Sequence, residues 1–317
     1  MVKHLKIFLS ATCFAALVGS SVAAPARRPF VPAAAGVPSS STSTASTTGT
    51  AGRPLTSTAA AACTRRCLSL RGGAGPLNAD TISKVYAGVV VGHGALDYLS
   101  PKAVYKMYEI ELVDSITSFV QSYVGGNQIA TVITLLGTVF SDQPALKAIG
   151  VGLLPGALKG ISHILDGTPQ ELGIHVPMQY VHNAAQLFVA RSLLTDAPNS
   201  TTVLKYFLAY LALAAVQCRV APQSALKTWG FPEEGTALQT FASKLLGQSG
   251  LALAVLAYTL GVEGGAVPTA VGRLALVYGA SLLEMLISGQ FTEIGVDNAK
   301  LYPWIGIAFV SAATLLL

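Results

Sequence analysis

The chain has 317 residues, of which 52% are hydrophobic and only 11% are charged, and its mean hydropathy is +0.56. Because a typical soluble domain is about 25% charged, this composition excludes an ordinary soluble protein and indicates a lipid bilayer as the main partner. The net charge of +5 arises from the first 79 residues, which hold eight Lys or Arg and no Asp or Glu, so the rest carries 12 basic and 15 acidic side chains. That balance excludes the basic surface of a nucleic-acid-binding protein.

The first 24 residues have the layout of a secretory signal peptide. Lys3 and Lys6 precede an apolar run over residues 7–18, and small residues follow up to Ala23. Residues 25–78 are rich in Ala, Ser, Thr, Pro and Gly, with scattered Arg. They have too few large apolar side chains to offset the entropy of ordering, so we expect a disordered, transit-like leader.

The order of these two segments also indicates a destination in the cell. A signal peptide followed by a basic, hydroxyl-rich segment without acidic residues resembles the two-part leaders of algae with secondary plastids, and the run Cys-Leu-Ser-Leu-Arg-Gly-Gly at residues 67–73 is similar to their junctions. The resemblance implies a plastid membrane, either thylakoid or envelope. The alternative is an endomembrane or cell-surface protein with a Ser- and Thr-rich stalk.

Residues 79–195 form the first predicted membrane unit, which crosses the bilayer four times. The spans are expected at residues 82–99, 129–140, 146–165 and 178–194. Residues 104–124 mix acidic and apolar side chains at helical spacing, which suits an interfacial helix or the polar foot of the second span. Gly125 and Gly126 allow a bend between this segment and the span.

Residues 202–317 form the second predicted unit, again with four crossings, at residues 203–220, 235–260, 267–287 and 301–317. An even number of crossings brings both units into the membrane from the same side, so the repeats run parallel about an axis along the membrane normal. The predicted fold is therefore all-α: an integral membrane protein with about eight transmembrane helices in two parallel four-helix repeats.

The evidence for a repeat lies in polar and small residues, which match by chance less often than Leu or Ala. At a spacing of 121 residues, Thr81 matches Thr202, Lys84 matches Lys205, Pro101 matches Pro222 and Gly126 matches Gly247. After one inserted residue the spacing is 122, where Gly150 matches Gly272, Glu171 matches Glu293 and Tyr180 matches Tyr302. The alternative interpretation is a coincidence of composition.

Three short motifs distinguish the first unit. Its first span runs into Leu-Ser-Pro at residues 99–101, Gly-Gly opens the second span, and the third span ends in Leu-Asp-Gly-Thr-Pro at residues 165–169. These motifs resemble the DoxX-like group of small four-helix membrane proteins, especially the DUF4345 proteins. The second unit shares less of the pattern, since residues 286–290 lack the Asp and the Pro. The resemblance implies a four-helix unit and no particular activity.

Ionisable side chains at membrane depth are energetically costly, so they are the first candidates for a polar functional site. His93 and Asp97 are one helical turn apart and are expected to share a face. They could form a carboxylate-oriented imidazole suited to proton handling, or a purely structural hydrogen bond.

A second group of ionisable side chains lies in the third and seventh spans. Lys159 and His163 share a face of the third span, and Glu284 is expected at the depth of Lys159, where the two could neutralise each other. Arg273 precedes Glu284 by three helical turns on nearly the same face, which is too far for direct contact.

His182 and Gln186 belong to a polar stripe on the fourth span, while the matching positions of the second unit are apolar. All histidines of the mature chain lie in the first unit, so we expect one cavity there, with the second unit as scaffold. Histidines converging on a metal or haem are the alternative, although no cofactor is predicted. Gly152, Gly156 and Gly160 form a row of small residues suited to close helix packing.

The sequence contains no Walker loop, no His-Glu-x-x-His and no Gly-x-Ser-x-Gly motif. We therefore expect a non-enzymatic component of a plastid membrane, either a carrier or channel for a small solute or a protein that binds a lipid or quinone. One alternative is a structural or assembly partner among the subunits of a membrane complex. The other is a membrane redox protein that uses the histidines.

Overall fold

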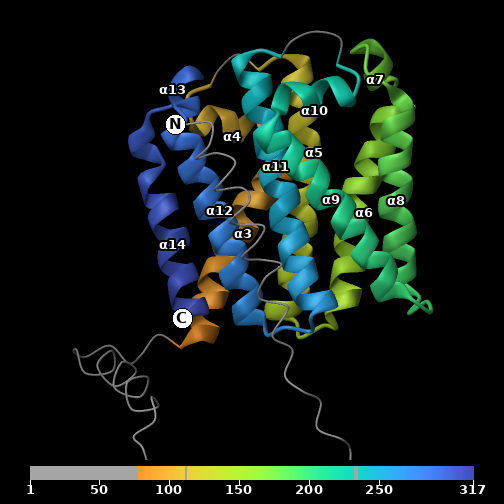
Figure 1. Cartoon of the computed structure of the whole chain (residues 1–317), viewed down its shortest axis with the longest axis vertical. Helices are drawn as coiled ribbons and strands as arrows, with labels where there is room; N and C mark the ends of the chain where they lie inside the picture. Colours follow the sequence, from red (N-terminus) through yellow and green to blue (C-terminus); the bar gives the residue numbers. More distant parts are fainter. Residues whose placement is uncertain (1–77, 111–112, 232–234) are drawn as a thin grey trace, which may run out of the picture. The chain divides into compact units, whose positions relative to one another are not determined.

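A computed structural model describes residues 78–110, 113–231 and 235–317, and every regular element within these ranges is a helix (Figure 1). The predicted signal peptide and almost all of the predicted leader lie outside the described residues. The first series of helices is α3 (Ala79–Leu99), α4 (Pro101–Met107), α5 (Ser115–Leu135) with the π-helix η1 (Leu136–Phe140), α6 (Ala145–Leu165), α7 (Thr168–Glu171) and α8 (Val176–Leu194). The second is α9 (Ser200–Val220), α10 (Pro222–Thr228), α11 (Ala237–Ala257) with η2 (Tyr258–Val262), α12 (Val267–Ile287), α13 (Gln290–Glu293), η3 (Asn298–Lys300) and α14 (Tyr302–Leu316).

The helices begin and end at residues whose chemistry suits those positions. Asn78 caps α3 by accepting a hydrogen bond from the Asp80 amide, and Asp114 caps α5 by accepting one from the Thr117 amide. Thr236 caps α11 in a reciprocal capping box. Gly167 and Gly289 end α6 and α12 in the left-handed conformation, at φ of 75° and 76°, which favours glycine.

Among the described residues, the two series have the same order of α-helices, and the first five pairs have matching bounds, whereas only the second series has a 3-10 helix, η3, before its last helix. Helices α3 and α4 begin 121 residues before α9 and α10, while α5, α6 and α7 begin 122 residues before α11, α12 and α13. The extra residue therefore falls before α5 and α11, and not after Gly126 as the sequence predicts. Gly125 is thus the counterpart of Gly247, and both approach the end of a preceding helix, Gly125 at Asp97 and Gly247 at Arg219.

The segment expected at residues 104–124 is divided in the structure. Helix α4 ends at Met107, and α5 begins afresh after its Asp114 cap and continues through η1 to Phe140. Gly125 and Gly126 lie inside α5 and do not separate a foot from a span. Gly126 instead permits close packing, because a Cβ atom there would lie 3.3 Å from the Gly156 Cα of α6.

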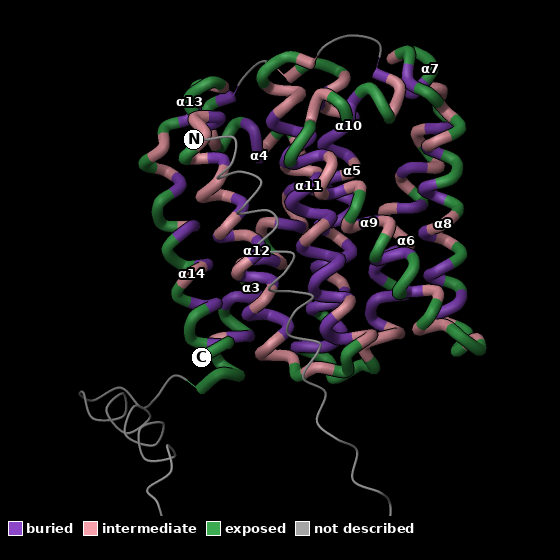
Figure 2. Tube along the Cα trace, in the orientation of Figure 1, coloured by how far each residue is buried: buried purple, intermediate pink, exposed green. Residues whose placement is uncertain are grey.

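Helices α5 and α11 pack against each other and form the centre of the described bundle (Figure 2). In an apolar 18-residue stretch of each of these two spans, 72% and 67% of the residues are buried, against 33–50% in the other four apolar spans. In the first series α3 and α6 pack on α5, and α8 packs on α6. In the second, α9 and α12 pack on α11, and α14 packs on α12, while α8 meets α9 and α3 meets α12 and α14.

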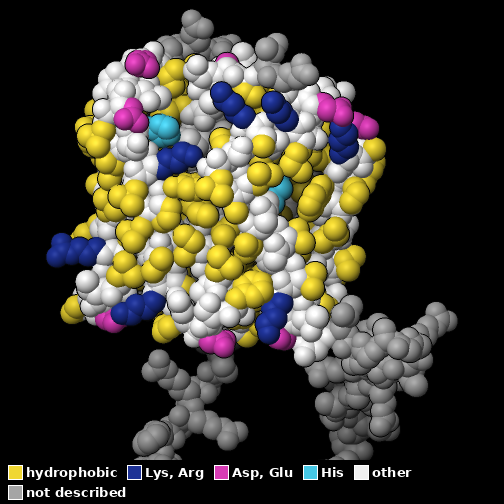
Figure 3. All heavy atoms as spheres, turned by 180° about the vertical axis from the view of Figure 1, so that it is seen from behind, with side chains coloured by type: hydrophobic (Ala, Val, Ile, Leu, Met, Phe, Trp, Pro, Cys, Tyr) yellow, Lys and Arg dark blue, Asp and Glu magenta, His cyan; other side chains and the backbone are white. Residues whose placement is uncertain are grey.

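In the described part of the chain, six helices are long and apolar enough to cross a membrane: Ser115–Phe140, Ala145–Leu165, Ser200–Val220, Ala237–Val262, Val267–Ile287 and Asn298–Leu316. The face seen in Figure 3 agrees with this assignment, since hydrophobic side chains cover its middle and most charged side chains lie toward its two ends. Exposed large apolar residues on the long helices include Phe188, Tyr206, Leu213 and Val310. The described chain is therefore a helical membrane protein.

Candidate functional site

A cavity of about 140 Å³ lies between the two series of helices. One water molecule needs about 10–15 Å³ by this measure, so the space accommodates a substantial part of a small organic molecule. The lining comes from α3, α4 and α5 on one side and from α11, α12 and α14 on the other. The distribution of histidines predicts a cavity confined to the first unit. This prediction is wrong, because each series of helices supplies one wall of the cavity.

A chain of hydrogen bonds lies along one wall of the cavity. The Tyr105 hydroxyl donates to Gln121 Oε1 at 2.9 Å, and Gln121 Nε2 donates to Asp97 Oδ1 at 3.2 Å. His93 Nδ1 lies 3.1 Å from Asp97 Oδ2. Asp97 and Gln121 are 2% and 1% exposed, so the carboxylate is withdrawn from lipid and held by two donors.

Tyr105 belongs to a short helix outside the apolar spans and keeps its role as a donor. Burial, and next the negative charge of Asp97, raise the pKa of the Tyr105 hydroxyl well above its usual range. The same two causes raise the pKa of the neighbouring Tyr108 hydroxyl. Both hydroxyls therefore remain protonated at neutral pH, and the direction of the chain from Tyr105 to Asp97 is fixed.

A second polar group lies at Gln128, two helical turns after Gln121 on α5, where a Cβ atom on Gly94 of α3 would lie 3.4 Å from the Gln128 Cβ. Here the Tyr278 hydroxyl donates to Gln128 Oε1 at 2.7 Å. Gln248 also lines the cavity and is 5% exposed, yet its Oε1 has no hydrogen-bond partner among the described residues. A buried acceptor of this kind marks a place where a ligand or water is needed.

The rest of the lining is apolar and aromatic, including Val89, Leu245, Phe291 and Ala308. The Trp304 ring meets the His93 ring edge-on, with 6.2 Å between centroids. Trp304 comes from α14, whereas His93 comes from α3, so the contact joins the two series of helices. A mostly apolar cavity with a few placed polar groups is typical of a small-molecule site.

The positions that correspond to this cavity in the other series line a much smaller space of about 20 Å³. Asp97 has Cys218 as its counterpart, Tyr105 has Leu226, and Gln121 has Ser243. Large side chains such as Trp229 and Phe231 occupy the wall. The polar chain is therefore a property of one cavity, and we take that cavity as the candidate site.

Lys159 and Glu284 do not form the pair expected from their depth. Lys159 Nζ donates to the Tyr98 carbonyl oxygen at 3.3 Å and lies 4.7 Å from the centre of the Tyr98 ring. Glu284 is bound by Arg219 at 2.6 Å and by Lys244 at 3.3 Å. The reason is the packing, because α6 lies on α5 and α8 whereas α12 lies on α11 and α14.

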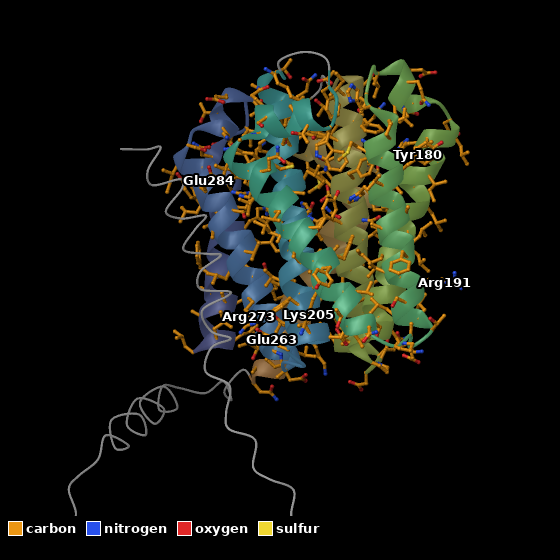
Figure 4. The ribbon with its side chains drawn as sticks, turned by 45° about the vertical axis from the view of Figure 1, so that its right-hand side comes forward. Tyr180, Arg191, Lys205, Glu263, Arg273 and Glu284 are labelled. Carbon is orange, nitrogen blue, oxygen red and sulfur yellow. The ribbon has the colours of Figure 1, made fainter. Side chains whose placement is uncertain are left out.

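Arg273 forms an ion pair with Glu263 and also donates to the Thr259 hydroxyl at 3.1 Å. Figure 4 shows Arg273 and Glu263 near one end of the bundle and Glu284 toward the other. In the same view Arg191 projects outward from α8. The expected separation of Arg273 from Glu284 therefore agrees with the structure, and each has partners of its own.

His182 lies away from the cavity, in a cluster of aromatic rings. Its Nδ1 is 3.2 Å from the Tyr210 hydroxyl, and its ring meets the Trp229 ring edge-on at 5.6 Å. Gln186, one turn further on α8, is also buried, and its Oε1 has no partner in the described part of the chain. His163 packs on the Phe119 ring, with 5.4 Å between centroids.

His163 and His182 border one cluster of aromatic rings, through Phe119 and Tyr123, whereas His93 lines the candidate cavity. The three histidines therefore do not converge on one point. Within residues 78–110, 113–231 and 235–317, no three His, Cys, Asp or Glu side chains are grouped so that they could hold a metal ion.

The glycine row on α6 permits contacts with two different helices. A Cβ atom at Gly152 would lie 2.7 Å from the Ala130 carbonyl oxygen, and one at Gly156 would lie 3.2 Å from the Gly126 carbonyl oxygen. These two residues let α6 approach α5. Gly160 instead leaves room for the Asn183 side chain of α8.

Sequence reasoning did not identify several side chains that complete the cavity. Five of these are polar or aromatic residues within or next to apolar helices: Tyr105, Gln121, Gln128, Gln248 and Tyr278. The available signal was the set of glutamines inside otherwise apolar segments, because an uncharged amide in a span also requires buried partners. Comparison of the chain with family models, curated proteins and solved structures gives no significant match, so function is argued from this geometry.

Proposed function

We propose that the chain is an eight-span protein built of two parallel four-helix units, in which α3 and α8 also cross the membrane. Helices α3 and α8 have 21 and 19 residues, and at 1.5 Å per residue this length of about 30 Å matches a bilayer core. Their hydropathy is low because they carry polar side chains. Some of these, such as Asp97 on α3 and Gln179 on α8, are buried inside the protein and therefore do not face lipid. The matching bounds of the two series support the parallel arrangement.

The proposed function is to bind a small amphipathic molecule of the lipid or quinone class between the two units. The observation that carries this proposal is the cavity of about 140 Å³ with an apolar lining and a buried polar chain from Tyr105 to His93. An apolar body would contact the Val, Leu and Phe side chains, and a polar head would meet the hydrogen-bonding groups.

The test is to identify what the protein retains after purification. Wild-type protein in mild detergent is extracted with organic solvent, and the extract is analysed by mass spectrometry against a blank of the same detergent and lipid. We expect about one equivalent of an amphipathic compound. Val89→Trp, which fills the cavity, should lose this compound.

Val85→Trp is the matched control, because Val85 lies one turn earlier on the same helix and is 64% exposed. It introduces the same side chain outside the cavity and should retain the compound. Equal retention by all three proteins, or no compound above the blank, would refute the proposed function. Size-exclusion profiles and far-ultraviolet circular dichroism establish that the variants are folded.

A further inference from the structure

The polar groups of the cavity are unequally supplied with partners. Tyr105, Gln121 and Tyr278 each donate a hydrogen bond to an acceptor inside the protein, and His93 Nδ1 faces the Asp97 carboxylate. These donors are therefore occupied by the fold itself.

The Gln248 amide differs from these groups, because it is buried, it lines the cavity, and its Oε1 has no partner among the described residues. Gln248 lies in the middle of α11, the helix at the centre of the bundle, which is far from bulk water. A buried carbonyl oxygen of this kind requires a donor, and a cavity ligand is in a position to supply it.

A hydroxyl group fits this demand better than a carbonyl or ether group. A hydroxyl donates one hydrogen bond and accepts others, so it can satisfy Gln248 Oε1 while its own oxygen stays available to another donor. A carbonyl or ether oxygen only accepts, and would leave the Gln248 oxygen without a partner. A charged amine head is less suitable, because the one carboxylate in the lining, Asp97, is already held by Gln121 and His93.

We propose that the molecule bound in this cavity is a lipophilic compound whose polar head is a hydroxyl group, and that Gln248 selects it by accepting a hydrogen bond from the hydroxyl. The proposal rests on the proposed function, since it names the chemical class of ligand for the same cavity. Aliphatic prenyl alcohols and prenylated phenols share this chemistry, and the experiment distinguishes these two sources.

The chain has two tryptophans, Trp229 and Trp304, and only Trp304 lines the candidate cavity. Trp229→Phe protein therefore reports binding through Trp304 emission alone. It is titrated with a fifteen-carbon prenyl alcohol and with the methyl ether of that alcohol, and then with a prenylated phenol and its methyl ether. We expect the hydroxyl compound of at least one pair to bind about tenfold more tightly than its ether.

Variants then test whether Gln248 is the source of this preference. In Trp229→Phe/Gln248→Met protein the preference should fall to about onefold, because the acceptor is gone while the side chain keeps its length. Gln186→Met is the matched control, since Gln186 also has a buried Oε1 without a partner in the described chain but lies on α8 outside the cavity. The tenfold preference should persist in that variant.

The outcomes separate the two proposals. If alcohol and ether bind equally in Trp229→Phe protein, or if Gln248→Met keeps the preference, the hydroxyl proposal is wrong although the cavity still binds amphipathic molecules. If none of the four compounds changes Trp304 emission, the proposed function fails as well. If Gln248→Met does not fold, the ratio of alcohol to ether affinity in Trp229→Phe protein still tests whether the cavity prefers a hydroxyl head.

Discussion

The single residue with the largest consequence for the site is Gln121. Its amide accepts from Tyr105 and donates to Asp97, so it holds the two ends of a buried chain in register. Asp97 lies in the last turn of α3, and its carboxylate also contacts the His93 imidazole, with 3.1 Å between Oδ2 and Nδ1. An isolated carboxylate in this position would be costly to bury, and the two donors make it tolerable.

Gln121→Leu should therefore destabilise the protein by about 2 kcal/mol, because it leaves a buried carboxylate oxygen and a buried hydroxyl without their partner. The measurement is thermal or denaturant unfolding in one detergent. Gln217→Leu is the control, since the Gln217 amide bonds to an exposed Thr228 hydroxyl and its loss should change stability by less than about 0.5 kcal/mol. Equal effects of the two substitutions would contradict this role of Gln121.

At the scale of the helices, close approach depends on where a glycine faces another backbone. Gly152 lies against the Ala130 carbonyl of α5, with room for hydrogen only. Gly88 of α3 has the opposite surroundings, because a Cβ atom there would meet no atom within 4 Å in the described chain. Two chemically identical substitutions at these glycines should therefore have opposite effects.

Gly152→Ala should destabilise the protein by about 1–3 kcal/mol, because α6 must move away from α5 to admit the methyl group. Gly88→Ala should be neutral or stabilising by up to about 1 kcal/mol, because alanine favours the helix. Unfolding of the two variants under the same conditions measures the contrast. A neutral effect at Gly152 would show that the α5–α6 contact is looser than described.

The start of α5 gives a prediction about pH. Burial alone would raise the pKa of the Asp114 carboxyl, but hydrogen bonds from Thr117 and Gln239 outweigh it and lower this pKa below its ordinary value of about 4. A lowered pKa in the folded state stabilises the protein at pH values above the ordinary pKa of the carboxyl. This contribution is lost as the pH falls through the lowered pKa.

Asp114→Ala should accordingly be less stable than wild type by about 1 kcal/mol at pH 7, and the difference should shrink below about pH 4. Asp114→Asn keeps a capping oxygen that does not titrate. The difference in stability between Asp114→Asn and Asp114→Ala should therefore not change with pH in this range. Unfolding midpoints between pH 3 and pH 7 test both statements. A difference that grows toward low pH would contradict the sign of this argument.

At the scale of the whole molecule, the proposed arrangement of eight spans in two parallel units predicts which loops share a side of the membrane. Lys102 and Lys227 follow the first helix of each series, Lys84 and Lys205 lie near the start of that helix, and all four are exposed. With the other cysteines replaced by serine, single cysteines at Lys102 and Lys227 should react with a membrane-impermeant reagent from the same side. Those at Lys84 and Lys205 should react from the opposite side, and reaction at Lys84 and Lys102 from one side would exclude α3 as a span.

The sequence predicted the long helices well because their apolar lengths and their terminating Pro and Gly residues are local signals. The contact of His93 with Asp97 followed from a spacing of four residues on one helix. The partners of Glu284 did not, since Arg219 and Lys244 are 65 and 40 residues away and are chosen by packing. Gln248 was overlooked because an amide in an apolar run gives no local sign of facing a cavity. The DoxX-like resemblance and the plastid address stay predictions.

The cavity takes one wall from each series of helices, with His93 on α3 and Trp304 on α14 in edge-on contact. A fragment ending near residue 195 would carry the imidazole without its indole neighbour, and the complementary fragment would carry the reverse. Complementation of two separately expressed fragments should therefore restore ligand retention that neither fragment possesses. Because the two halves are joined in one chain, they are always present in equal amounts. Of the two spaces that correspond between the series, the one lined by Trp229 and Phe231 is nearly filled by large rings, while the candidate cavity stays open.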